Sequence, residues 1–166
     1  GKRSFKNKAL LSNLDASIAE QKNSTKEKIR IAVVMGGYSS ERHISVESGR
    51  NIFEKLSSSS KYQPIPVFLT GSDEQHRLFV LPINILLKDN ADDIREKVIG
   101  FKGHHPILVN IAKETESITN RYVNNAIKDP KEITYKELSE MADGVFIALH
   151  GRPGEDGSMQ KELEKY

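Results

Sequence analysis

One strand–turn–helix stretch, residues 29–56 (IRIAVVMGGYSSERHISVESGRNIFEKL), constrains the fold of this chain most strongly. Residues 29–35 form an apolar run rich in β-branched side chains, which predicts a buried strand. Gly36-Gly37 predicts a sharp turn directly after it. Apolar residues then recur at helical spacing, so we expect a helix over residues 43–56.

The turn between this strand and this helix has the form of a ligand site. Glycines let the backbone approach a ligand, and a helix start offers unpaired N–H groups and a partial positive charge. Many α/β folds share that form, but here the turn is crowded with polar residues from Ser39 to Ser45. We interpret Ser39 and Ser40 as helix caps rather than nucleophiles, because no Asp–His pair follows in a triad-like arrangement.

Composition limits the class of protein. With 166 residues, 37% hydrophobic and 29% charged, the chain can form one domain with a real core. No apolar stretch is long enough to span a membrane, and no signal peptide pattern is present. The absence of cysteine excludes disulfides and thiolate metal sites and favours a cytoplasmic location.

The first 27 residues differ in composition from the rest and are expected to be a leader. Leu10, Leu11, Leu14 and Ile18 fall at helical spacing, which indicates a short amphipathic helix followed by a polar linker. Seven Lys/Arg against three Asp/Glu lie in residues 1–28, whereas the remainder carries a charge of −2. A domain so near neutrality gives no argument for a nucleic-acid partner.

Residues 28–166 alternate between strand and helix patterns. Strands are expected at 62–69, where Pro64 and Pro66 suggest an edge or an irregular start, at 77–81 as a hairpin partner, at 106–111 and at 145–149, with a further short apolar run at 83–87. Helices are expected from Asn90 to 98, at 114–127, at 134–141 with a Thr134/Glu137 capping box, and from 158 onward. This alternation predicts a three-layer α/β domain, a parallel sheet with helices on both faces.

The second informative stretch is GVFIALHGRPGEDGSMQKELEKY at residues 144–166. His150 follows the last predicted strand, so it is expected at the carboxyl edge of the sheet, where open α/β folds bind ligands. Glu155 or Asp156 is expected to hydrogen-bond one imidazole nitrogen and set the tautomer. A histidine at a strand end is often only structural, but this glycine- and carboxylate-rich loop favours a site. Arg152 either reaches a phosphate or carboxylate or is merely solvated.

The segments GGYSSERHISVESG (36–49) and ALHGRPGEDGSMQ (148–160) resemble the two signature blocks of the N-terminal domain of D-alanine–D-alanine ligases. The resemblance implies a pre-ATP-grasp, Rossmann-like domain of an enzyme that joins two D-alanines for peptidoglycan. In that family ATP phosphorylates the carboxylate of the first D-alanine, and the amine of the second attacks the acyl phosphate. ATP and Mg²⁺ are held by later domains, so no cofactor is expected in these 166 residues, and the chain is expected to be an excised, inactive N-terminal domain. A homodimer is also implied.

Carried over by motif position, the resemblance implies a role for four side chains. Glu41 would engage the ammonium group of the first D-alanine as the catalytic and substrate-binding carboxylate. Ile44 would line its methyl pocket, and His150 would lie beside the same substrate with support from Glu155. The loop backbone would come from Gly36, Gly37, Gly151, Gly154 and Gly157.

No metal site is expected, and two alternatives stay open. His104 and His105 are neighbours without an acidic cluster, an unfavourable arrangement for holding one ion. Lys161 stands where the family has a small residue, so it either loosens the last helix or extends its stem to water. The alternative function is an autonomous α/β module that binds an amino acid or a nucleotide at the Gly36-Gly37 turn.

Overall fold

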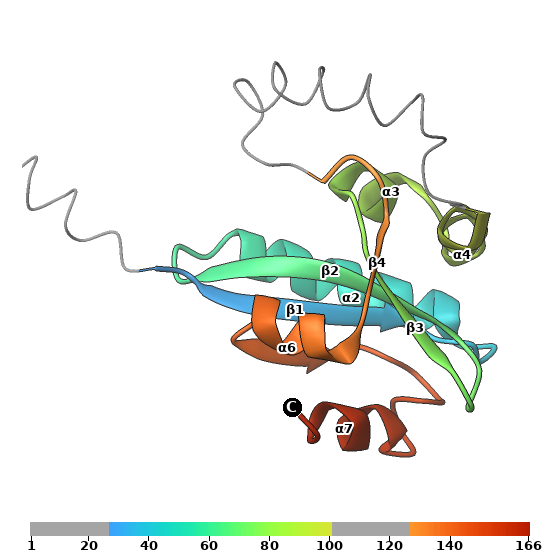
Figure 1. The fold of residues 1–166 in the computed structure, drawn as a ribbon. Helices are drawn as coiled ribbons and strands as arrows, with labels where there is room; N and C mark the ends of the chain where they lie inside the picture. Colours follow the sequence, from blue (N-terminus) through green and yellow to red (C-terminus); the bar gives the residue numbers. More distant parts are fainter. Residues whose placement is uncertain (1–26, 101–126) are drawn as a thin grey trace, which may run out of the picture.

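The structure, a computed structural model, describes residues 27–100 and 127–166. Its elements follow the chain in the order β1 (Ile29–Gly36), α2 (Arg42–Ser57), β2 (Tyr62–Gly71), β3 (His76–Val80), α3 (Ile83–Lys88), α4 (Ala91–Gly100), β4 (Lys131–Ile133), α6 (Tyr135–Met141), β5 (Gly144–Ile147) and α7 (Ser158–Leu163) (Figure 1). Within these two ranges, no helix has both the length and the apolar character needed to cross a membrane.

The strands form one five-stranded sheet in the order β4-β3-β2-β1-β5. β1 is parallel to both of its neighbours, pairing Ile29 with Tyr62 of β2 and Ile31 with Gly144 of β5. β2 and β3 form the predicted antiparallel hairpin, and β4 adds to it antiparallel. The α/β prediction is therefore confirmed, but the expectation of a parallel sheet is wrong for the β3–β4 side, and the sheet is mixed.

Of the two interpretations of Pro64 and Pro66, the edge strand is wrong. β2 lies in the middle of the sheet, but its N-terminal half pairs only with β1, because its pairing with β3 begins at Val67. Pro64 therefore lies beyond this pairing, and Pro66 lies at its end, where Pro66 O accepts a hydrogen bond from the N–H of Leu81, the residue after β3. A missing N–H is tolerated at such positions, as it is on an edge strand.

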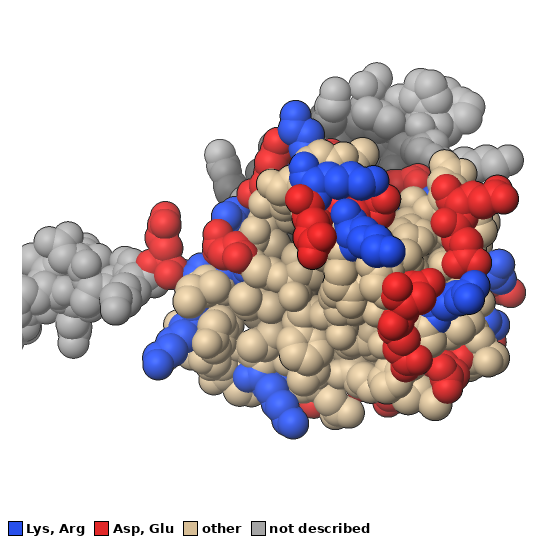
Figure 2. All heavy atoms as spheres, turned by 90° about the horizontal axis from the view of Figure 1, so that it is seen from below, with Lys and Arg blue, Asp and Glu red and all other residues tan. Residues whose placement is uncertain are grey.

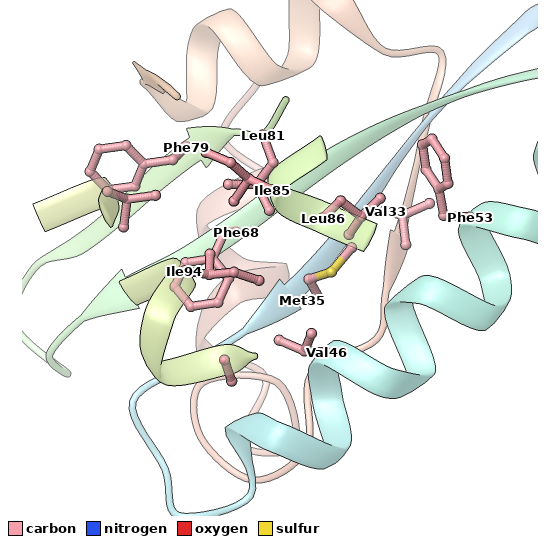
Figure 3. Packing of buried hydrophobic residues seen from close by; sticks show 12 residues of the cluster. Val33, Met35, Val46, Phe53, Phe68, Phe79, Leu81, Ile85, Leu86 and Ile94 are labelled. Atoms are coloured by element: carbon pink, nitrogen blue, oxygen red, sulfur yellow. The ribbon is translucent and has the colours of Figure 1, made fainter. Parts of the chain in front are cut away.

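One face of the sheet is covered by α2, α3 and α4 (Figure 1). Alternate residues of β1, Val33 and Met35, point to this side and pack with Val46 and Phe53 of α2 and Phe68 of β2 (Figure 3). Side chains alternate between the two faces of a strand, so the unbroken apolar run of residues 31–35 in β1 requires cover on both faces. This packing holds the start of α2 close to the end of β1.

The other face is covered by α6 and α7. Ala32 and Val34 of β1 pack here with Leu138 of α6 and Met159 of α7, all nearly or fully buried. From below the view of Figure 1, the side on which α7 lies, acidic and basic side chains lie beside one another around a broad area of uncharged residues (Figure 2).

Several boundaries and burial states differ from the prediction. β5 ends at Ile147 rather than at residue 149, although the Ala148 N–H still donates to Val34 O at 2.8 Å. It is also less buried than predicted: as an edge strand it leaves Phe146 43% exposed. β4 was not predicted, because three residues are too few for a period to show. The run at residues 83–87 lies in a helix, α3.

Some of the expected elements are confirmed in detail. Asn90 Oδ1 accepts hydrogen bonds from the N–H groups of Asp92 and Asp93 at the start of α4. The Thr134/Glu137 capping box is present at the start of α6. Lys161 is exposed on α7, so its side chain extends toward water. The leader helix, the strand at 106–111, nearly all of the helix at 114–127 and the His104-His105 pair lie outside the described residues.

Candidate functional site

The turn after β1 lies against the loop that follows β5. Gly36 and Gly37 both have φ of +96°, a conformation that side-chain-bearing residues rarely adopt. A Cβ placed on Gly37 would lie 3.3 Å from the backbone oxygen of Arg152. The two stretches singled out in the sequence therefore meet at the carboxyl edge of the parallel strands.

Two serines join these segments by hydrogen bonds. The Ser45 hydroxyl, fully buried, accepts from the Gly36 N–H and donates to Ala148 O, both at 2.9 Å. The Ser39 hydroxyl donates to His150 O at 2.9 Å and accepts from the Glu41 N–H at 3.2 Å. The start of α2 is thereby tied to the loop carrying His150.

The carboxylate of Glu41 reaches the loop after β5. A Cβ placed on Gly151 would lie 3.0 Å from Glu41 Oε2 and 2.9 Å from Ser39 Oγ, so both side chains lie against this loop. Glu41 occupies the N-cap position of α2 but makes no capping hydrogen bond with its side chain, and the residue is exposed. The Glu41 carboxylate thus lies beside the residue that follows His150. Because it is exposed, it can meet a ligand at this edge of the sheet.

The imidazole of His150 is paired differently from the prediction. Its Nε2 lies 3.0 Å from Ser48 Oγ, on α2. Asp156 instead accepts hydrogen bonds from the hydroxyl and N–H of Ser158, which hold the pKa of its carboxyl below the ordinary value. Neither Glu155, which is exposed, nor Asp156 has a hydrogen bond to the His150 ring within the described part of the chain. The expected Glu155 or Asp156 hydrogen bond is thus absent, and Ser48 was missed.

The remaining predicted site residues lie in the two segments that meet here. Ile44, 54% exposed, precedes Ser48 by four residues and so shares its face of α2. Gly151 and Gly157 have positive φ, and a Cβ on Gly154 would lie 2.6 Å from Leu149 Cβ. An open groove of about 440 Å³ begins at His150; its lining includes Ser48, Asn51, Ile52, Phe146 and Leu149.

These groups favour recognition of a small charged molecule rather than covalent catalysis. A carboxylate binds an ammonium group by a charge-assisted hydrogen bond, an imidazole can pair with a carboxylate, and an exposed isoleucine can contact a methyl group. Across residues 27–100 and 127–166, no group of three or more His, Asp or Glu side chains is placed to hold a metal ion.

Ser45 and Ser48 were missed as site residues, although a signal for them was present. Both lie in the same block as Glu41 and Ile44, and Ser48 follows Ile44 by one helical turn. Which strand end each serine would meet could be read only from the packing of α2 against the sheet.

The family model described as D-ala D-ala ligase N-terminus matches residues 30–166. The chain belongs to this family. The D-alanine–D-alanine ligase of Chlorobium limicola is 28% identical over 137 residues, which make up 82% of this chain and 33% of that protein. The D-alanine–D-alanine ligase of Pseudoalteromonas translucida is 53% identical over 49 residues, 29% of this chain and 16% of that protein.

A solved structure, that of the VanG D-Ala:D-Ser ligase of Enterococcus faecalis, is similar with a TM-score of 0.46 at 20% identity, over 83% of this chain and 34% of that one. The chain spans about a third of the length of the curated ligases that it matches over most of its own residues.

Proposed function

We propose that this chain is the part of an ATP-dependent D-alanine–D-alanine ligase that binds the first D-alanine. The proposal is supported by family membership over residues 30–166. The observation that carries it is the meeting of two loops: Glu41 Oε2 lies against Gly151, and Ser39 bonds the backbone of His150. A small zwitterion bound at this edge of the sheet could contact the side chains of Glu41 and His150 at once.

Glu41 is proposed to bind the ammonium group of the substrate. The carboxylate is exposed and lies beside Gly151, close to Ser39. It can therefore accept hydrogen bonds from an ammonium ion. Such a charge-assisted bond is roughly twice as strong as a neutral one. Ile44, exposed on the same helix, is proposed to contact the methyl group.

His150 is proposed to lie beside the same D-alanine. Ser48 Oγ, 3.0 Å from Nε2, would set the orientation of the ring and leave Nδ1 for the ligand. A fixed partner on one imidazole nitrogen decides the role of the other. The support of His150 by Glu155 rests on the family resemblance alone, because Glu155 is exposed and makes no hydrogen bond to the ring in the described residues.

ATP would supply the phosphoryl group that converts the carboxylate of the first D-alanine into an acyl phosphate, which the amine of the second D-alanine attacks. The dipeptide would serve peptidoglycan synthesis. In the described ranges no three metal-ligating side chains lie together. We propose that ATP and Mg²⁺ are held by parts of the polypeptide outside these 166 residues.

Substitutions in the full-length ligase test the proposal. Glu41→Gln and His150→Ala should each lower kcat/KM for the first D-alanine by about ten- to hundredfold, because losing one partner of a charged hydrogen bond costs about 1–3 kcal/mol. Steady-state ADP release at varied D-alanine concentration measures this. Glu54→Gln, which changes an exposed carboxylate on the same helix, should leave the kinetics unaltered. Wild-type kinetics in both site variants would remove Glu41 and His150 from the site.

The same proposal predicts that this chain alone releases no ADP from ATP and D-alanine. Isothermal titration calorimetry should detect no sub-millimolar ATP binding to it, and turnover by the 166 residues would contradict the proposal.

A cytoplasmic location is proposed from the use of ATP and the lack of cysteine. The homodimer stays a prediction, which sedimentation of the full-length protein would test.

A further inference from the structure

The tip of the β2–β3 hairpin lies beside the candidate site. Its turn is closed by mutual backbone hydrogen bonds between Ser72 and Gln75, at 3.0 and 3.3 Å. Asp73 is exposed at this tip, and its two carboxylate oxygens have different partners. Tyr38 Oη donates to Oδ1 at 2.5 Å, and Arg152 Nη1 lies 3.5 Å from Oδ2.

The hydrogen bond from Tyr38 fixes the turn that carries Glu41. Tyr38 precedes Glu41 by three residues, and its half-buried ring packs against the core beneath β1 and lies 6.2 Å from the His76 ring. Burial and the hydrogen bond to Asp73 raise the pKa of Tyr38 to about 12. The ring is thus held by packing at one end and by Asp73 at the other.

The ion pair with Arg152 involves the loop that carries His150. Arg152 follows His150 by two residues, and its guanidinium lies between Asp73 and Asp156, the latter at 3.8 Å. The side chain is 68% exposed, so this ion pair adds little to stability. It nevertheless ties the loop to the same carboxylate that holds Tyr38.

We propose that Asp73 is a positioning residue, which holds the Glu41 turn through Tyr38 and the His150 loop through Arg152 in the relative placement that binds the amino acid. Asp73 itself would touch no substrate. The identity of the ligand rests on the proposed function, whereas the link between the two loops does not.

Kinetics of the full-length ligase test the inference with Asp73→Ala and Tyr38→Phe, the second of which removes a single hydroxyl. Each should raise KM for the first D-alanine by about three- to tenfold while kcat stays within about twofold, because removing this hydrogen bond loosens the site before the substrate arrives and so weakens binding most. The double variant should be no worse than the more impaired single variant, because both remove the same hydrogen bond. Glu74→Ala, an exposed carboxylate at the same tip, is the matched control.

Hydrogen–deuterium exchange of the same proteins gives a readout that needs no ligand. Asp73→Ala and Tyr38→Phe, but not Glu74→Ala, should increase deuterium uptake in peptides covering residues 36–41, and Asp73→Ala also in those covering 150–157. If the wild type uses D-alanine but both variants match Glu74→Ala, the inference is overturned and the proposed function stands. If the wild type does not use D-alanine, the proposed function fails. Deuterium uptake alone then supports or overturns the role of Asp73 in holding the two loops.

Discussion

Ser45 is a polar side chain at zero exposure that connects the ends of two strands. Its hydroxyl accepts from the N–H of Gly36, the last residue of β1, and donates to the carbonyl of Ala148, just past β5. The hydroxyl thus satisfies two backbone groups that would otherwise lack a partner in a buried place. An unpaired buried polar group costs about 1–3 kcal/mol, so a serine is worth more here than an apolar residue of the same size.

Ser45→Ala should therefore lower the free energy of unfolding by about 1–3 kcal/mol. Urea denaturation followed by circular dichroism measures the change. Ser139→Ala is the control, because Ser139 is exposed and its hydroxyl donates to Lys136 O within its own helix. Equal stabilities of the two variants would mean that water replaces the Ser45 hydroxyl at no cost.

At the scale of elements, α6 shows how a short helix is started by local chemistry. Thr134 Oγ1 accepts from the N–H of Glu137, and Glu137 Oε2 accepts from the N–H of Thr134, at 3.1 and 2.7 Å. Hydrogen bonds from the backbone and hydroxyl of Thr134 lower the pKa of the Glu137 carboxyl. Helix α6 has only seven residues, too few to be stable without a cap and tertiary packing.

Thr134→Ala should destabilise the chain by about 0.5–2 kcal/mol, the usual cost of losing an N-cap side chain. Thermal unfolding by calorimetry measures the change. Lys136→Ala removes an exposed side chain from the same helix and should shift stability by less than about 0.5 kcal/mol. A Thr134→Ala protein as stable as Lys136→Ala would show that packing of Leu138 alone maintains α6.

At the scale of the whole molecule, an ion pair joins the start of β1 to the residue before β5. Arg30, near the start of β1, donates from Nε and Nη2 to the two carboxylate oxygens of Asp143, and its backbone N–H donates to Oδ2. Asp143 directly precedes β5, so this ion pair accompanies the pairing of Ile31 with Gly144. The Arg30 side chain first, and its N–H second, lower the pKa of Asp143 to about 2.

This pKa predicts a pH dependence with a definite sign. A carboxyl whose pKa is lower in the folded than in the unfolded state contributes stability above the unfolded value, near 3.8, and loses it as the pH falls toward about 2. Asp143→Asn should therefore flatten the fall in Tm between about pH 4 and pH 2. Both side chains are more than 40% exposed, so added salt should reduce the difference.

Tm measured by circular dichroism at several pH values tests this prediction. Asp93→Asn is the control, since its carboxylate has no ion pair or hydrogen bond with another side chain in the described part of the chain. The idea is wrong if Asp143→Asn and Asp93→Asn lose Tm equally steeply in acid.

The elements that could be predicted are those whose cause is local. Four features each depend on residues that are close in sequence: the apolar run of β1, the periodic face of α2, the hairpin after Gly71 and the Thr134 capping box. The meeting of the two glycine-rich loops also followed, because parallel strands bring their carboxyl ends to one edge.

What could not be predicted depends on how elements face one another. The sequence by itself determined that two polar, glycine-rich segments follow buried strands. Only the tertiary structure decided that the sheet is mixed, that β5 lies at one edge of it, and that Ser48 rather than Glu155 meets His150. Local preferences act over a few residues, whereas strand order and side-chain partners across about 100 positions depend on how helices and strands share one core.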